Sequence, residues 1–222
     1  MKENIPTTGT RSTDGRIYLE YDWYGGGIPS NVSFGADVYI DTAYGFASYF
    51  SEHEGGLRLG DATGAYDRTS FVVGRGGLVR VGSYTVLNGT YLICHERIEI
   101  GDHCLIAWGS VITDTWAGLQ DAPLEARRHA LAAAAADPAR ILPPVGVARP
   151  VVLEDNVWVG FDSVILPGVR LGRGAIIGCK TVVSKDVPPY AVVVGAPPRC
   201  VRRLKPDDTD EVRQRALREH AR

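Results

Sequence analysis

Residues 153–183 read LEDNVWVGFDSVILPGVRLGRGAIIGCKTVV, and an aliphatic residue stands at every sixth position of this stretch. These positions are Leu153, Val159, Ile165, Leu171, Ile177 and Val183. An α-helix repeats its buried face every three or four residues and a simple strand every second residue, so neither explains a period of six. We therefore predict a solenoid in which each six-residue unit forms one short strand and one turn, and three units close a triangular coil.

The positions between these aliphatic residues also repeat. Small or β-branched residues stand four places after them, at Val157, Ser163, Val169, Ala175 and Thr181. Glycine often follows the aliphatic residue directly, as at Gly101, Gly160, Gly172 and Gly178. Glycine permits the sharp backbone corners that such a coil needs. In an ordinary β-sandwich such a regular six-residue spacing of aliphatic, small and glycine residues would be a coincidence. We therefore favour a coil whose aliphatic residues stack inside.

The same rhythm shows how far the coil extends. It recurs earlier, with a slip of one residue after the third position, at Val81, Leu87, Ile93, Ile100, Ile106 and Ile112. Shorter β-type runs begin at about Ile28. We predict an irregular segment at 1–27, a β-helix domain at 28–204 and a short capped helix at 205–222.

A different composition interrupts the rhythm between residues 119 and 140. The run LQDAPLEARRHALAAAAADPAR is rich in alanine, which favours helix. Asp121 is a candidate N-cap, and Asp137 followed by Pro138 ends the run. We predict a helical insertion at 119–140.

The composition of the chain excludes several classes of protein. The 222 residues suffice for one large domain with a real core, and a formal net charge of −2 predicts no general attraction to nucleic acid or membrane. We find no signal peptide and no apolar span, and we expect a cytoplasmic protein. The four cysteines form no CxxC pair, so we expect small core residues in a reducing compartment.

The segment VWVGFDSVILPGVRLGRGAIIGCKTVVSKDVPPYAVVVGAPPRCVRR, residues 157–203, resembles the C-terminal half of the sugar and antibiotic O-acetyltransferases. These enzymes belong to the hexapeptide-repeat acyltransferase superfamily. The resemblance covers roughly residues 81–204, and 28–80 more weakly. It implies an all-β fold, a left-handed parallel β-helix, and acetyl-CoA or another acyl-CoA as co-substrate. It also implies a homotrimer that binds the coenzyme in the cleft between two subunits.

The resemblance assigns coenzyme-binding positions residue by residue. Phe161 stands where the family often has serine, and its backbone N–H would lie near the thioester and stabilise the oxyanion. The positions that match the pantetheine path are Cys179, Ser184 and Lys185. Arg199 and Arg202 match basic residues that meet the CoA phosphates, to which guanidinium groups are well suited.

The histidine base of the family is missing from its usual place. Many relatives carry it about four residues after the aspartate of a segment like Ile112-Thr113-Asp114, but this chain continues with Thr-Trp-Ala-Gly. A hydroxyl acceptor needs such a base because its own pKa is high.

Three explanations remain open. Another histidine can replace the missing one: His129 on the insertion, or His95 on the preceding coil, whereas His103 reads as a corner residue. The acceptor can instead be an amine, with Asp114 orienting it or receiving a proton; alternatively Asp114 only holds a turn. The site can also be catalytically inactive, which would leave a β-helical binding or scaffold protein.

Competing enzyme classes fit less well. A γ-class carbonic anhydrase needs three zinc-binding histidines on adjacent coils, and we predict no metal site. A nucleotidyltransferase needs a glycine-rich α/β domain in front of the coil, for which the first eighty residues are too few. We therefore predict an acyltransferase that acts on a hydroxyl or amine of a small, sugar-like molecule. The residues expected to contact the acceptor are Asn88, His95, Asp114 and Trp116.

Overall fold

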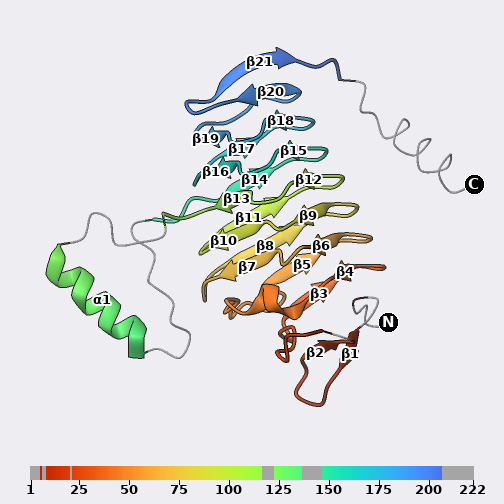
Figure 1. Ribbon diagram of the computed structural model, residues 1–222, viewed down its shortest axis with the longest axis vertical. Coiled ribbons are helices and arrows are strands. Elements are labelled where there is room, and N and C mark those ends of the chain that lie inside the picture. Colours follow the sequence, from red (N-terminus) through yellow and green to blue (C-terminus); the bar gives the residue numbers. More distant parts are fainter. Residues whose placement is uncertain (1–5, 7–8, 21, 117–122, 137–146, 207–222) are drawn as a thin grey trace, which may run out of the picture.

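The protein is a three-sided column of stacked coils (Figure 1). The computed structural model describes residues 6, 9–20, 22–116, 123–136 and 147–206. Each side of the column is one sheet of six, eight or five strands, all parallel except the last strand of the eight-stranded sheet, and the chain visits the three sheets in that order in each coil. The predicted parallel β-helix is confirmed, because strands that follow one another in the sequence lie on different sides.

Each sheet collects one strand from every coil. The six-stranded sheet contains β3 (Val32–Phe34), β5 (Leu57–Leu59), β8 (Leu78–Val81), β11 (Arg97–Ile100), β14 (Val151–Leu153) and β17 (Arg170–Leu171). The eight-stranded sheet contains β4 (Tyr39–Ile40), β6 (Gly64–Tyr66), β9 (Val86–Asn88), β12 (Leu105–Ile106), β15 (Trp158–Val159), β18 (Ile176–Ile177), β20 (Ala191–Val194) and β21 (Arg199–Arg203). The five-stranded sheet contains β7 (Ser70–Val73), β10 (Tyr91–Cys94), β13 (Val111–Thr113), β16 (Val164–Ile165) and β19 (Val182–Val183).

The three edges of the column are the corners between sheets, and we name them by the sheets they join. The six–eight corner follows the strands of the six-stranded sheet. The eight–five corner follows those of the eight-stranded sheet, and the five–six corner follows those of the five-stranded sheet.

The aliphatic residues of the repeat form ladders inside the column. Ile106, Val159 and Ile177 pair in register on neighbouring coils, and all three are fully buried. The small residues of the repeat are buried as well, including Ser163 and Ala175 at 0% exposure. The ladder excludes water only because each coil covers the next, so a single coil would not be stable alone.

The predicted ladder position at Ile93 is wrong. Leu92 is fully buried and pairs with Ile112 and Phe71, whereas Ile93 is only half-buried. Leu92 stands only five positions after Leu87, and the next ladder residue, Ile100, stands eight positions after Leu92. The extra length forms the corner at residues 94–97, which a constant period cannot anticipate.

Other segments differ from expectation at the ends of the column. Part of the segment expected to be irregular is an antiparallel hairpin of β1 (Gly9–Arg11) and β2 (Ile17–Leu19), and a short 3-10 helix, η1 (Ala43–Phe46), follows β4. At the other end β21 pairs antiparallel with β20. The predicted C-terminal helix falls almost wholly outside the described residues.

The inserted helix and two of the four cysteines lie where the sequence predicts them. The helix α1 (Leu124–Ala136) lies within the predicted insertion, and the proposed cap and stop residues lie outside the described part. Figure 1 shows α1 standing clear of the coils. Cys94 and Cys104 are buried as expected, but Cys179 and Cys200 are exposed, so the prediction of four core cysteines is wrong for these two. No helix within the described ranges is long and apolar enough to cross a membrane.

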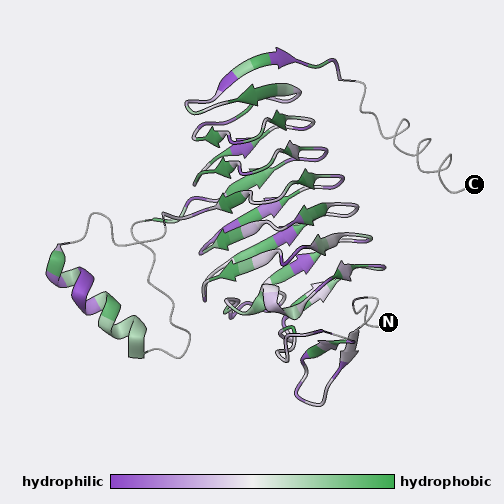
Figure 2. Cartoon of the chain, viewed as in Figure 1, coloured by the Kyte–Doolittle hydropathy of each residue, from purple (hydrophilic) through white to green (hydrophobic). Residues whose placement is uncertain are grey.

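The outer faces of the sheets differ in chemistry (Figure 2). Paired outward positions on the six-stranded sheet are charged, among them Arg58, Arg80 and Glu99. The outward row of the eight-stranded sheet is mostly apolar and runs in register through Tyr39, Gly64, Val86, Leu105, Trp158, Ile176 and Val192. A continuous apolar row on an outer face is typical of a surface that another molecule covers.

Candidate active site

The residues singled out from the sequence fall into two groups on two different corners. The eight–five corner carries Asn88, Phe161 and Cys179, and the adjacent strand β21 carries Arg199 and Arg202. The five–six corner carries His95, Asp114, Trp116, Ser184 and Lys185. Within one molecule the five-stranded sheet separates the two groups, so the structure does not bring all of them together.

The first group lines up along one exposed edge. A Cβ on Gly160 would lie 2.7 Å from the backbone nitrogen of Cys179, so two successive turns of the eight–five corner are in close contact here. Strand β18, which precedes Cys179, pairs with β20, and Val194 at the end of β20 pairs with Arg199 of β21. The edge therefore leads from Phe161 past Cys179 to Arg199.

Strand β21 adds positive charge next to this edge. All five of its residues are exposed, and three of them are arginines. Arg199 pairs with Val194 at the eight–five end of β20, whereas Arg202 and Arg203 pair with Val192 and Ala191 toward the other end of that strand. Exposed guanidinium groups grouped on one strand suit an anionic ligand with several oxygens.

Sequence reasoning missed an aromatic partner of Phe161. The Trp108 ring stacks on Phe161 with a centroid distance of 5.6 Å and an interplanar angle of 13°, and its indole N–H donates to the Asp67 carboxylate. Both rings are about half exposed, at 46% and 47%. The repeat contained the signal, because Trp108 follows Ile106 by two residues just as Phe161 follows Val159.

On the five–six corner, Asp114 is fully buried and its carboxylate is occupied by the backbone. Its oxygens accept hydrogen bonds from the N–H groups of His95 at 2.8 and 3.1 Å, Glu96 at 2.7 Å and Arg97 at 2.8 Å. The Cys94 thiol donates to the same carboxylate at 3.4 Å. This is the turn-holding arrangement that the sequence left open as one role for Asp114.

The His95 imidazole is half-buried beside this turn. Burial lowers its pKa below the ordinary value, and the nearby Asp114 carboxylate partly opposes the shift. Burial raises the pKa of the Cys94 thiol, and Asp114 adds to that shift. At neutral pH the corner therefore presents a neutral imidazole and a neutral thiol.

The other predicted histidines lie elsewhere. His129 is an exposed residue of α1, and the described contacts do not bring it to either group. His103 is confirmed as a corner residue, with a φ of 57° and its ring stacked on Tyr84 at 5.0 Å. Among the described residues there is no group of three or more His, Cys, Asp or Glu side chains that could hold a metal ion.

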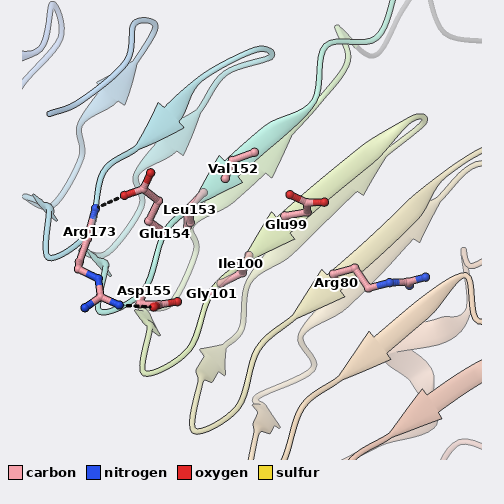
Figure 3. Close-up of a pocket in the computed structure, with 9 residues that line it drawn as sticks. All are labelled: Arg80, Glu99, Ile100, Gly101, Val152, Leu153, Glu154, Asp155 and Arg173. Carbon is pink, nitrogen blue, oxygen red and sulfur yellow. Dashed lines mark hydrogen bonds and ion pairs between the residues drawn. The ribbon is translucent and has the colours of Figure 1, made fainter. Parts of the chain in front are cut away.

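A shallow cavity of about 380 Å³ opens on the six-stranded sheet (Figure 3). Its charged groups already have partners: Arg173 pairs with Asp155 at 2.7 Å, and the Arg80 guanidinium donates to the Gly55 carbonyl at 2.6 Å. None of the residues predicted for the site lines this cavity. We therefore place the candidate site on the two corners and not here.

Comparison with known proteins identifies the family of the coil. The family model "Bacterial transferase hexapeptide (six repeats)" matches residues 150–185. A hexapeptide-repeat acetyltransferase from Vibrio cholerae, solved in complex with acetyl coenzyme A, is 30% identical with a TM-score of 0.52, over 66% of this chain and 70% of that one. AntD, an N-acyltransferase from Bacillus cereus, shares the fold at 20% identity and a TM-score of 0.57, over 86% and 89% of the two chains.

Curated relatives match over a shorter stretch. A chloramphenicol acetyltransferase of Agrobacterium fabrum is 43% identical over 58 residues, which are 26% of this chain and 28% of the relative. The match therefore spans little more than a quarter of that relative's length. The chain belongs to the hexapeptide-repeat acyltransferase superfamily, and its column is the left-handed β-helix of that family.

Proposed function

We propose that the protein transfers an acyl group from acyl-CoA to a hydroxyl or amine of a small, sugar-like molecule. The observation that carries this proposal is the exposed edge from Phe161 past Cys179 to the arginines of β21. Support comes from the Vibrio cholerae relative, which was solved with acetyl coenzyme A.

The proposed reaction assigns a task to each part of the edge. Arg199 and Arg202 hold the CoA phosphates, and the pantetheine arm runs past Cys179 toward Phe161. The Phe161 N–H donates no hydrogen bond to any described residue, so it is available to the thioester oxygen as negative charge develops there. The acceptor oxygen or nitrogen attacks the carbonyl carbon, the C–S bond breaks, and the acceptor's proton ends on the CoA sulfur.

The proposal includes a homotrimer, because the two groups of proposed site residues lie on different corners of one molecule, the eight–five corner and the five–six corner. A second copy would bring its five–six corner, with His95, Ser184 and Lys185, against the eight–five corner of the first. The apolar row that includes Leu105 and Trp158 supports such a contact, since these side chains are 41% and 47% exposed in the single chain. Sedimentation of the wild type and of Trp158→Glu tests this part: a trimer that dissociates in the variant is expected.

Calorimetric titration with acetyl-CoA tests the coenzyme edge. We expect micromolar binding, an affinity about tenfold weaker in Arg199→Ala because a charge-assisted contact is lost, and no change in Arg58→Ala. Arg58 is a matched control because it is an exposed arginine on the six-stranded sheet, away from the edge. A folded protein that binds neither acetyl-CoA nor CoA would show that the assignment is wrong.

A further inference from the structure

The imidazole of His95 occupies space that a glycine leaves open on the neighbouring coil. A Cβ built on Gly74 would lie 2.8 Å from His95 Nδ1 and 3.0 Å from Cε1, and its three nearest atoms all belong to this ring. Gly74 does not have a positive φ, so its backbone does not require glycine. What requires glycine at position 74 is the ring of His95.

The backbone of His95 is held from the other side. Asp114 accepts from three consecutive N–H groups, those of His95, Glu96 and Arg97, at distances of 2.7 to 3.1 Å. A buried carboxylate with its oxygens engaged in this way holds the turn rigidly. It is poorly placed to serve as a base itself, because accepting a proton would disrupt these bonds.

The surroundings keep the His95 ring neutral. The charged group that acts on it is Asp114 from the next coil. Cys94, Glu96 and Arg97 are its neighbours on its own strand and corner, and Arg75, which follows Gly74, forms an ion pair with Glu52 at 2.6 Å. Burial outweighs the attraction of Asp114, so the pKa of His95 lies below its ordinary value of about 6.5. A neutral imidazole is the form that accepts a proton.

We propose that His95 replaces the family's missing histidine as the general base, and that Gly74 and Asp114 are positioning residues for its ring. The inference rests on the proposed function. One imidazole nitrogen takes the proton of the acceptor hydroxyl while the oxygen bonds to the thioester carbon. The C–S bond then breaks, and the imidazolium returns the proton to the leaving thiolate, which departs as CoA-SH.

The placement of His95 fits this role between two copies. It lies on the five–six corner, as does Asp114, whose coil carries the segment where relatives have their histidine.

Replacing Gly74 by alanine is a selective test, because the added methyl group meets the imidazole and not the backbone. Gly76→Ala is the matched control in the same corner, since its Cβ meets only the His95 carbonyl oxygen, at 3.4 Å. Three quantities are measured in each: the acetyl-CoA Kd, thiol release from acetyl-CoA with water or chloramphenicol as acceptor probe, and the His95 pKa by NMR.

In Gly74→Ala we expect an unchanged acetyl-CoA Kd, thiol release at least about tenfold slower and a His95 pKa that rises toward 6.5 as the ring moves into solvent. Gly76→Ala should stay within about twofold of wild type in all three. His95→Ala should lose about a hundredfold in thiol release and regain part of it with added imidazole.

The outcomes separate this inference from the proposed function. Wild-type thiol release in Gly74→Ala or His95→Ala would overturn the role of His95, and so would a protein that binds acetyl-CoA but releases no thiol with either acceptor. Absence of acetyl-CoA binding in the wild type would overturn the proposed function itself.

Discussion

The six–eight corner and the five–six corner of the same column follow opposite rules. The six–eight corner repeats one turn in coil after coil, and its third residue has a positive φ at Asp37, Ala62, Tyr84, His103, Asn156, Gly174 and Tyr190. Asp61 and Asp102 repeat a bond here, each accepting from a backbone N–H of the preceding coil, at 2.8 and 2.7 Å.

The five–six corner differs in each coil. The turn at residues 94–97 wraps the buried carboxylate of Asp114 and carries the imidazole of His95 over Gly74, and the turn that begins at Asp114 gives rise to the insertion that contains α1. A repeated corner forms the same backbone hydrogen bonds in coil after coil. An irregular corner can carry contacts that occur only once in a repetitive scaffold, and binding residues are found at such places. This difference teaches where to look for the site in a protein whose coils are otherwise alike.

The largest expected effect is a loss of stability on removing a corner carboxylate, and it should differ between Asp114 on the five–six corner and Asp61 on the six–eight corner. Asp114→Ala should lower the free energy of unfolding by about 3–5 kcal/mol, because three N–H groups lose their shared acceptor, a fully buried carboxylate. Asp61→Ala should cost only about 0.5–1.5 kcal/mol, since its bond to Ala36 is exposed to water. Urea unfolding measures both, and equal losses would mean that the corners do not differ in this way.

A smaller effect is expected from glycines on the two corners. An alanine Cβ at Gly101 on the six–eight corner would lie 2.7 Å from the Asp155 backbone nitrogen of the next coil. Gly101→Ala should therefore cost about 1–3 kcal/mol through overpacking, whereas Gly76→Ala on the five–six corner should stay within about 0.5 kcal/mol of wild type. Thermal unfolding distinguishes them; a Gly76→Ala variant as unstable as Gly101→Ala would contradict the comparison.

The last effect concerns one buried thiol on each corner. It is the smallest at neutral pH, because these thiols change the free energy of unfolding only in alkaline solution. Burial raises the pKa of Cys104 to about 11 and also raises that of Cys94. Above pH of about 8.5 the unfolded chain ionises these thiols while the folded protein keeps them protonated, so stability falls as pH rises. The slope should reach up to about 1.4 kcal/mol per pH unit for each thiol.

Single alanine variants check the thiol prediction. Cys104→Ala and Cys94→Ala should each flatten the dependence of unfolding free energy on pH between about 9 and 11. A dependence that stays the same in both variants would mean that other groups cause the alkaline loss.

Much of the column was predictable from residues 153–183, where the period of six is unbroken. The buried positions Leu153 to Val183 and the small residues between them are confirmed, because a residue's place in a regular repeat decides which way its side chain points. The prediction failed at Ile93, where the period is interrupted. Local spacing cannot say which of two neighbouring aliphatic residues turns inward when a corner takes up extra length.

The candidate site was predictable only in part. The residues of the coenzyme edge were named from the resemblance, but their division between two corners needed the topology. Trp108 and Gly74 were missed: one shows its role only beside Phe161, and the other only beneath the ring of His95.

The sequence by itself determined the triangular coil, its buried ladder and its family, since these depend on a pattern that every unit repeats. The tertiary structure alone decided that Asp114 closes the turn at residues 94–97 and that His95 lies over Gly74. The physical reason is that each such contact joins consecutive coils about twenty residues apart, and the register between coils is set by how all their strands pair and pack together.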